Sequence, residues 1–374
     1  MKTPDEFDLL DPETIEDPYP FFACLREHAP VHRVPGTEVH LVSKRALVEE
    51  ALERHEDFSA NLTGVLMTGL SGEPELFDLT RFGSSVDGIA NADEPAHAVH
   101  RKLVLPHVTP KGIAALEPTL RGWADELMTP LIEAGSGDWI ERVANPLPTR
   151  AMATVVGLPL ADADLLLEWA MTGTEILAGT TTPERMAYVG AKTGEMTAYL
   201  RARLERALGA PAGRPAEGVI GELARGVREG LISDSDGVSI LVVLAGAGGE
   251  STSSLTGNAV RILAEQPALQ AELRARPERI GAFVEEAVRL ETPFRGHYRA
   301  VKRATKLGGV ELSLGIRDRG MCSLRTPTNS VQCWKMASPI THCPPSPALL
   351  QTMAVPPAAR RSSSRELASC REQG

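Results

Sequence analysis

The stretch Val238-Ser-Ile-Leu-Val-Val-Leu-Ala-Gly-Ala-Gly-Gly-Glu-Ser-Thr-Ser-Ser-Leu255 decides how the chain folds. Its apolar residues keep a helical spacing, and Ser or Asp at 233–234 can cap the start, so the pattern predicts a long helix. Each interior glycine costs about 1 kcal/mol relative to alanine. A helix with three of them in four positions needs a compensating gain. The three are Gly246, Gly248 and Gly249.

Two explanations account for the glycines. Another helix can pack closely against them, or a flat ligand can lie across them with Glu250 and Ser251 beside it as a proton-delivering acid and alcohol. Glu250 is the only charged residue between Val238 and Val260. A lone carboxylate in so apolar a helix is unfavourable unless it has a partner or a role. The stretch alone leaves both explanations open.

Composition limits the class of protein. The chain has 374 residues, of which 43% are hydrophobic and 24% are charged, as in ordinary soluble globular proteins. A net charge of −10 argues against nucleic acid or an anionic membrane as a partner. We expect a cytoplasmic protein, because the N-terminus does not resemble a secretory signal and no apolar run reaches the ~18 residues that a membrane span needs. Cys24 is the only cysteine before position 322, which fits a reducing compartment.

The remaining pattern is mostly helical, with a small sheet at each end of the chain. Strands are predicted at Val39–Val42 and His297–Val301, and a hairpin at Lys306–Leu312. Ser43 is predicted to cap a helix that runs to about Arg54, and Ala60–Ala92 to form a long mobile loop with one short helix. Further helices are predicted at 17–26, 94–104, 116–131, 159–176, 183–208, 218–230, 267–274 and 277–290.

Two of these helices carry charged candidates. Asp93 is predicted to cap the helix from Glu94, on which His97 and Arg101 share one face. That face either binds an anionic ligand or is an ordinary solvated basic face. In the last helix Glu286 and Arg289 are three residues apart and can pair. The apolar residues expected to face inward there are Ile280, Phe283, Val284 and Ala287.

Taken together, these segments resemble a bacterial cytochrome P450, a soluble haem-thiolate monooxygenase. The resemblance runs from about Asp11 to Leu314. It is carried by Asp17-Pro-Tyr-Pro, Ala29-Pro-Val-His, Glu94-Pro-Ala-His-Ala-Val-His-Arg101, Ala247-Gly-Gly-Glu-Ser-Thr252, Glu286-Ala-Val-Arg289 and Arg299. The resemblance implies a mainly α fold with minor β sheets, incomplete at its C-terminus.

The resemblance also implies roles for particular residues. His97, Arg101 and Arg299 would bind the carboxylates of haem b, iron protoporphyrin IX, which lies over Ala247 and Gly248. Glu250, Ser251 and Thr252 would be catalytic and deliver protons during oxygen activation, with Ser251 where the family more often has threonine. Glu286 and Arg289 would be structural. Electrons would come from ferredoxin and ferredoxin reductase, and one oxygen atom would enter a small apolar substrate.

After Leu314 the family pattern stops. The family's cysteine loop, which supplies the axial iron ligand, is missing, so no metal ligand is identified. The last 60 residues, 315–374, are rich in Arg, Pro and Ser and show no periodicity. We therefore assign 1–314 to an incomplete P450-like domain and 315–374 to a disordered or off-frame tail. A reading-frame change near Gly315 is the simplest explanation.

Other interpretations of the chain remain. Cysteines of the tail, with or without His342, could act as substitute iron ligands or form a zinc site, although none has the flanking glycines or paired spacing for it. Those cysteines are Cys322, Cys333, Cys343 and Cys370. Without a thiolate ligand the chain would be a non-catalytic remnant that binds haem or an apolar ligand. An unrelated helical scaffold without haem leaves the ordered motifs unexplained.

Overall fold

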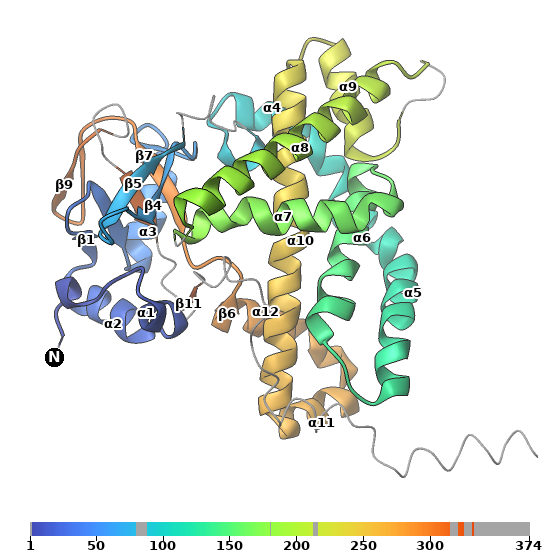
Figure 1. Cartoon of the computed structure of the whole chain (residues 1–374), viewed down its shortest axis with the longest axis horizontal. Helices are drawn as coiled ribbons and strands as arrows, with labels where there is room; N and C mark the ends of the chain where they lie inside the picture. The colour runs from blue at the N-terminus through green and yellow to red at the C-terminus, as the bar shows by residue number, and fades with distance from the viewer. Residues whose placement is uncertain are drawn as a thin grey trace, which may run out of the picture.

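The computed structural model describes residues 2–79, 88–179, 181–211 and 216–314, and two strands beyond them. Figure 1 shows a helical part beside a smaller part that holds the N-terminus and most strands. The helices are α1 (Pro12–Glu16), α2 (Tyr19–His28), α3 (Arg45–Glu53), α4 (Ala96–Val104), α5 (Pro110–Ala134), α6 (Pro146–Val156), α7 (Ala163–Ala178), α8 (Pro183–Leu208), α9 (Gly218–Arg228), α10 (Asp234–Glu265), α11 (Pro267–Ala275) and α12 (Ile280–Leu290).

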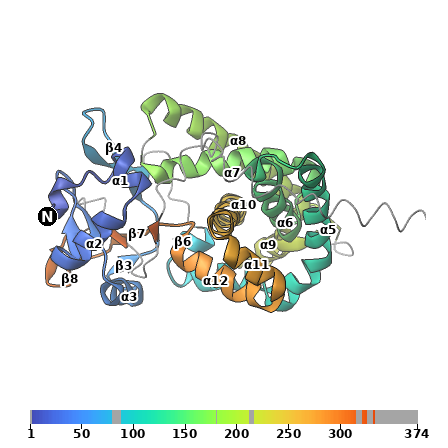
Figure 2. The ribbon, with the colours of Figure 1, turned by 90° about the horizontal axis from the view of Figure 1, so that it is seen from below.

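The helix α10 is the central element of the helical part. The Ser233 hydroxyl accepts a hydrogen bond from the Asp236 backbone N–H at 3.1 Å, and the Asp236 carboxylate accepts one from the Ser233 N–H at 2.8 Å. This reciprocal capping fixes the first turn. The helices α6, α7, α8, α9, α11 and α12 all contact α10, and Figure 2, which looks nearly along its axis, shows it within their ring.

By length and composition α10 is also apolar enough to cross a membrane, with a mean hydropathy of 1.3 over its best 18-residue window. The sequence pattern, in which we found no apolar run of membrane-spanning length, did not identify this helix. The core helix of a globular protein passes the same test, and α10 is surrounded by other helices of this chain. Within the described fold 39% of that window is buried, so packing against the other helices accounts for part of its apolar composition.

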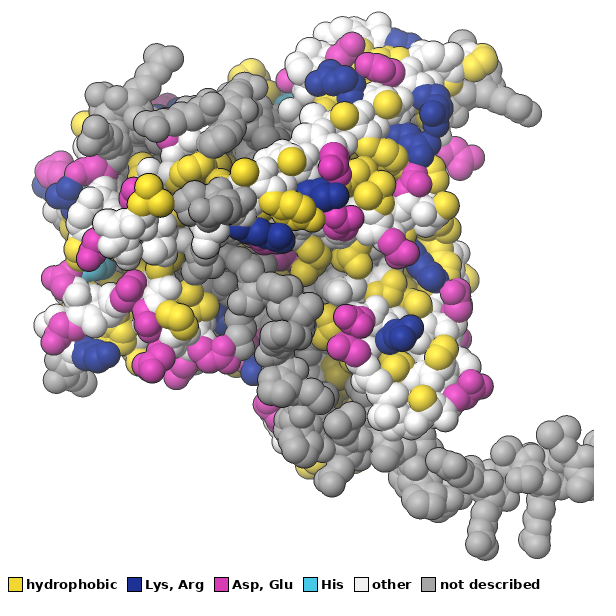
Figure 3. Space-filling view, viewed as in Figure 1, with side chains coloured by type: hydrophobic (Ala, Val, Ile, Leu, Met, Phe, Trp, Pro, Cys, Tyr) yellow, Lys and Arg dark blue, Asp and Glu magenta, His cyan; other side chains and the backbone are white. Residues whose placement is uncertain are grey.

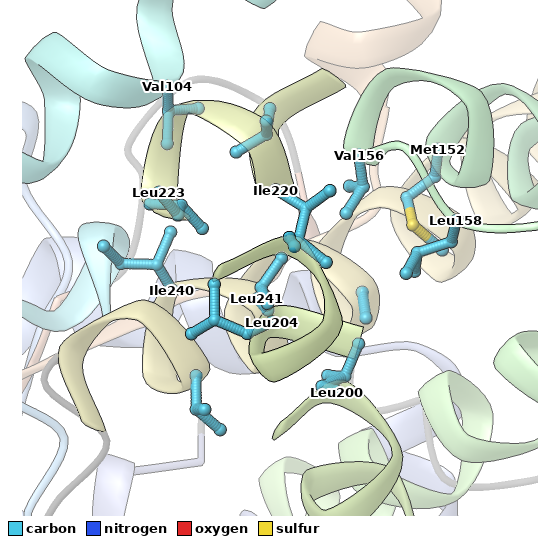
Figure 4. Close-up of a cluster of buried hydrophobic side chains, with 14 of the residues drawn as sticks. Val104, Met152, Val156, Leu158, Leu200, Leu204, Ile220, Leu223, Ile240 and Leu241 are labelled. Atoms are coloured by element: carbon cyan, nitrogen blue, oxygen red, sulfur yellow. The ribbon is translucent and has the colours of Figure 1, made fainter. Parts of the chain in front are cut away.

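The main hydrophobic core lies where α10 meets α4, α6, α8 and α9. Ile240 and Leu241 of α10 are fully buried there. Figure 4 shows them among side chains from the four other helices, all directed into one cluster. The labelled members of this cluster are Val104, Met152, Val156, Leu158, Leu200, Leu204, Ile220, Leu223, Ile240 and Leu241. The apolar first half of α10 thus anchors the fold.

The strands form four small sheets. They are β1 (Val31–Arg33), β2 (Val39–Val42), β3 (Phe58–Ser59), β4 (Gly64–Thr68), β5 (Pro74–Asp78), β6 (Glu291–Thr292), β7 (His297–Val301), β8 (Thr305–Leu307), β9 (Val310–Leu312), β10 (Met321–Leu324) and β11 (Val331–Gln332). The largest sheet has the order β1-β2-β10-β7-β3, and β10 is parallel to β2 and antiparallel to β7. Sequence-distant ends of the chain therefore meet in one sheet.

The predicted mainly α fold with minor sheets is confirmed, and so are most of the predicted elements. The strands β2 and β7 and the hairpin β8–β9 lie where the pattern placed them, and α8 spans the predicted 183–208. Thr182 caps α8 by accepting from the Arg185 N–H at 3.3 Å. The helix α6, with prolines in its first turn, was missed by the sequence pattern.

Two local predictions were wrong. Lys44, not Ser43, stands at the N-cap of α3, because the Ser43 hydroxyl points toward the Pro30 carbonyl and caps nothing. The segment 60–92 contains the antiparallel hairpin β4–β5 as well as the short 3₁₀ turn Ile89–Asn91. Val65 and Leu66 in this hairpin are buried, and Leu66 packs into the cluster around Phe21 and Leu41. Tertiary burial gives this stretch a strand structure.

The predicted inward face of α12 is correct only in part. Ala287 is buried, but Ile280, Val284 and Val288 are exposed along one stripe of the helix. The other face of α12 contacts α10. The stripe therefore lies on the outer side of the described fold. An uncovered apolar surface of this kind is what we expect if the final elements of the domain are missing.

The division of the chain at residue 314 stays a prediction. Most of 315–374 lies outside the described residues, including Cys333, Cys343, Cys370 and His342. Within that segment the structure describes only the backbone strands β10 and β11.

At the surface seen in Figure 3, acidic and basic side chains alternate with small hydrophobic groups, as on an ordinary globular surface.

Leu241→Ala should lower the free energy of unfolding by about 2–5 kcal/mol, because it leaves a cavity in the main core. Urea denaturation followed by circular dichroism measures the change. Leu70→Ala is the matched control, since Leu70 is 89% exposed at the turn between β4 and β5 and should change stability by less than about 0.5 kcal/mol. Equal losses in both variants would contradict the assignment of the core.

Candidate functional site

The three glycines of α10 have different surroundings. A Cβ on Gly248 would lie 2.6 Å from Cγ of Met152 in α6, and one on Gly249 would lie 3.4 Å from Oγ1 of Thr149. A Cβ on Gly246 would meet nothing within 4 Å. Close helix packing therefore explains Gly248, whereas a Cβ on Gly249 would make only an ordinary van der Waals contact. Gly246 borders open space, where a ligand can approach the helix.

Glu250 is buried beside this close contact. Glu250 is 2% exposed, and neither of its carboxylate oxygens accepts a hydrogen bond with good geometry. Burial raises the pKa of Glu250 to about 8, and Thr174 of α7 offsets only part of this rise. The Thr174 hydroxyl itself donates to the carbonyls of Ala170 and Met171, both at 3.1 Å. The acid is therefore mostly protonated and uncharged at neutral pH.

Ser251 and Thr252 lie on the accessible side of α10. The Ser251 hydroxyl donates to the Ala247 carbonyl at 2.7 Å, one turn back along the helix. Ala247 and Thr252 are exposed. Because successive residues of a helix point about 100° apart, the Glu250 carboxyl enters the interior while Ser251 faces outward. The helix thus separates a buried proton donor from an accessible hydroxyl on neighbouring residues.

The two basic candidates of α4 lie one turn apart on an accessible face. His97 Nδ1 is 2.9 Å from the Glu94 carboxylate, and Arg101 is exposed. The Glu94 carboxylate also accepts from the Ala98 N–H at 3.1 Å, in the first turn of the helix. The prediction that Asp93 is the cap was wrong: Pro95 is at the N-cap, and the Asp93 side chain binds Ala60 and Lys302 instead.

Arg299 lies in β7, between β3 and β10 in the large sheet. Its Nη1 donates to the carbonyl of Tyr298 at 2.8 Å. Arg299 is opposite Cys322 in the antiparallel register of β7 and β10. The third basic candidate is therefore carried by the sheet part, whereas His97 and Arg101 belong to the helical part.

Glu286 and Arg289 form the predicted ion pair, with Arg289 Nε 2.7 Å from a Glu286 carboxylate oxygen. Hydrogen bonding by Arg289 lowers the pKa of Glu286. The Glu286 side chain is 52% exposed and that of Arg289 38%. Next to this pair the Tyr19 hydroxyl donates to the Leu290 carbonyl at 3.0 Å, which fastens α12 to α2.

The sequence pattern did not identify the hydroxyl residues next to Glu250. Thr149 of α6 is buried and donates to the Asn145 carbonyl at 2.9 Å, and Thr174 of α7 is described above. The usable signal was a threonine on the apolar face of each of these helices. Such residues are common in helices, where the hydroxyl bonds to the preceding turn, so the signal has little specificity.

The chemistry of these residues matches what one face and the two carboxylates of a haem require. The Gly246 and Ala247 side of α10 is open and uncharged, and α4 and β7 carry the cations that haem carboxylates require. The described residues contain no cluster of His, Cys, Asp or Glu suited to a metal. Cys24, whose thiol donates to the Lys2 carbonyl, lies far along the chain from these elements. No axial iron ligand is therefore assigned among the side chains that the structure describes.

The fold and the site together define a helical protein built around a long central helix with a buried acid, an adjacent alcohol and a glycine-containing open face. Comparison with models of known protein families gives no match. Comparison with individual proteins does. Cytochrome P450 144 of Mycobacterium tuberculosis is 38% identical over 300 residues, which are 80% of this chain and 68% of that protein.

Two further proteins are similar to this chain over most of its length. The steroid C26-monooxygenase of Mycolicibacterium smegmatis is 29% identical over 331 residues, which are 84% of this chain and 73% of that protein. The crystal structure of CalO2 is 28% identical, with a TM-score of 0.71, and the match covers 87% of this chain and 78% of that one. The chain belongs to the cytochrome P450 family of monooxygenases, whose cofactor is haem.

Glu250→Gln should remove a pH-dependent loss of stability. The pKa of Glu250 is raised from 4.5 to about 8 on folding, so between these values the native state binds more protons than the unfolded state. The wild-type free energy of unfolding should then fall as pH rises from about 5 to 8, by up to about 1.4 kcal/mol per pH unit relative to Glu250→Gln.

Urea titrations between pH 5 and 8 measure this difference. Glu286→Gln is the control. The pKa of Glu286 is lowered by Arg289, so its contribution changes only in more acidic solution and should stay constant across this range. A parallel pH dependence of wild type and Glu250→Gln would show that Glu250 is ionised in the folded protein.

Proposed function

We propose that the chain is the substrate-binding and oxygen-activating part of a haem b-dependent monooxygenase, which inserts one atom of dioxygen into a small apolar organic substrate. The observation that carries this proposal is the arrangement of α10, where an uncharged, buried Glu250 adjoins Ser251 on an open face. Bound haem supplies the redox chemistry that activates dioxygen. The protein supplies orientation, protons and the exclusion of water.

The basic residues would hold the haem edge. Arg101 and Arg299 offer guanidinium groups that match carboxylates, and His97 adds a further donor. Ala247 and the backbone of Gly248 would form the surface under the macrocycle, next to open Gly246. The Glu286–Arg289 pair lies on α12 beside the Tyr19 contact, and its role would be to orient this part of α12.

The acid and the alcohol would act in sequence. Glu250 holds a proton on its carboxyl at neutral pH because burial raises its pKa to about 8. Its carboxyl would pass this proton toward the open face, where Ser251 Oγ, and Thr252 beyond it, would orient it. Ser251 must first release the Ala247 carbonyl, to which it donates at 2.7 Å. Burial of the acid keeps the proton from exchanging freely with solvent.

Three segments would contact the substrate: 60–92, 171–188 and the chain after Thr292. Two of them touch, because the Thr68 N–H donates to the Gly179 carbonyl at 2.8 Å. An apolar substrate is supported by the relative named as a steroid C26-monooxygenase. P450 relatives use redox partners, and we propose a separate ferredoxin and ferredoxin reductase as electron donors, all in the cytoplasm. The comparisons do not support the alternative of a non-catalytic remnant.

The absorption spectrum of the haem-supplemented 374-residue chain, reduced and exposed to carbon monoxide, tests the proposal. A red-shifted Soret band of the thiolate type would show that a cysteine of this chain binds iron. Cys322→Ser should abolish that band if the ligand is the cysteine of β10, and Cys24→Ser should not. Absence of the band would contradict turnover by this chain and assign it to a parent with an intact cysteine loop.

Arg101→Ala should weaken haem binding roughly tenfold or more, because a carboxylate loses a charged hydrogen-bond partner. His97→Ala should weaken it for the same reason. Haem titration followed by absorbance gives the dissociation constants. Lys102→Ala is the matched control, since Lys102 is an exposed cation on another face of α4. An unchanged dissociation constant in Arg101→Ala, or an equal effect of Lys102→Ala, would remove α4 from the site.

A further inference from the structure

The side chain of Asp93 joins three segments that are distant in sequence. One carboxylate oxygen accepts from the Ala60 N–H at 2.9 Å, directly after β3. The other lies 3.4 Å from the Lys302 ammonium, directly after β7. The backbone carbonyl of Asp93 accepts from the His97 N–H at 3.0 Å, at the start of α4. One residue thus links the edge of the large sheet to the helix of the helical part.

Lys302 is itself held firmly in place. Its backbone N–H donates to the Asp57 carbonyl at 2.7 Å, and its ammonium donates to the His55 carbonyl at 3.1 Å. The strand β7 ends one residue earlier and pairs with β3 through Val301 and Phe58. The Asp93 carboxylate therefore meets a cation whose position is set by the sheet.

The surroundings of Asp93 favour its charged form. Burial alone would raise the pKa of Asp93, but hydrogen bonds from Ser59 and from the Ala60 backbone, together with the charge of Lys302, lower it below its ordinary value. The side chain of Asp93 is about one-third exposed and that of Lys302 somewhat more. The contact is thus an ionic one at a partly covered junction, with a backbone hydrogen bond that fixes its direction.

The position of this junction matters because the basic residues of the proposed haem site are divided between its two sides. His97 and Arg101 lie on α4, four and eight residues after Asp93, and Arg299 lies on β7, three residues before Lys302. We propose that Asp93 is a positioning residue that holds α4 against β7, so that cations from both elements reach the same pair of haem carboxylates. This inference rests on the proposed function.

Binding of protoporphyrin IX and of its dimethyl ester, followed by fluorescence, tests the inference without an axial ligand or turnover. The ester lacks the carboxylates, so the ratio of the two dissociation constants reports carboxylate recognition alone. Asp93→Asn keeps an acceptor for the Ala60 N–H and loses the charge. It should reduce the preference for the free acid about fivefold to tenfold, and Lys302→Ala should do the same.

Lys306→Ala is the control, because Lys306 forms a surface pair with Glu311 at 2.7 Å in the β8–β9 hairpin. It should leave the preference unchanged. A merely structural role of Asp93 would weaken binding of acid and ester equally, and that result would overturn the inference. So would an unchanged preference in Asp93→Asn. The exchanged pair Asp93→Lys with Lys302→Asp should recover part of the preference.

The proposed haem site is tested separately within the same experiment. If His97→Ala and Arg299→Ala lose the preference for the free acid while Asp93→Asn keeps it, the site stands and the positioning role is wrong. If the wild-type chain binds acid and ester equally, both the carboxylate site and the positioning role are wrong.

Discussion

Burial of the Glu250 carboxyl against α6 and α7 is the constraint on which the candidate site depends. The same packing that places Ile240 and Leu241 in the core continues along α10 to Gly248 and Gly249, where α6 approaches so closely that a Cβ on Gly248 would overlap Met152. That approach excludes water from Glu250 and leaves its carboxyl uncharged. Glycine at position 248 therefore permits the close packing of α6 against α10. The same packing keeps Glu250, two residues later, in its protonated form.

The basic residues that we propose for the haem carboxylates have the opposite requirement, because their charges must stay ionised and accessible. These charges are placed by polar junctions between the sheet and the helices. Asp57, whose pKa is lowered to about 2 chiefly by its hydrogen bond from Arg54, also binds Arg303 and Thr305 and so fixes the turn after β7. Asp93 adds the link from that turn to α4. Packing in the core thus determines the protonation state of Glu250, and we propose that polar contacts at the surface determine the positions of the basic residues.

The sequence predicted those features whose signals are local. The start of α10 follows from Ser233 and its capping partner, and the range of α8 follows from Thr182 and Pro183. The hairpin β4–β5 was missed because its strand structure depends on burial of Leu66 against Phe21 and Leu41, which are more than twenty residues away. Asp93 was misassigned as a cap for the same reason, since its partners Ala60 and Lys302 are brought to it only by the folded sheet.

The ordered motifs indicated a haem site, but the sequence could not show how its parts are divided. His97 and Arg101 lie in the helical part and Arg299 in the sheet, so the joint use that we propose for them requires a fixed junction between the two parts. The spacing of the glycines left packing and ligand binding equally open, and the structure assigns Gly248 to packing and leaves Gly246 open. Whether a glycine packs against another helix or stays open depends on the neighbours that cover each side of α10. The local sequence does not show these neighbours.

The outer face of α12 connects the fold to the unusual end of the chain. Ile280, Val284 and Val288 recur every four residues along one exposed stripe, which is the pattern of a helix that expects an apolar partner. The Glu286–Arg289 pair is exposed as well, and a surface ion pair contributes little to stability. The sequence after Leu314 changes to an Arg, Pro and Ser composition without apolar periodicity. We keep a reading-frame change near Gly315 as our hypothesis for both observations, because such a change would preserve α12 and replace the segment that would cover its apolar stripe.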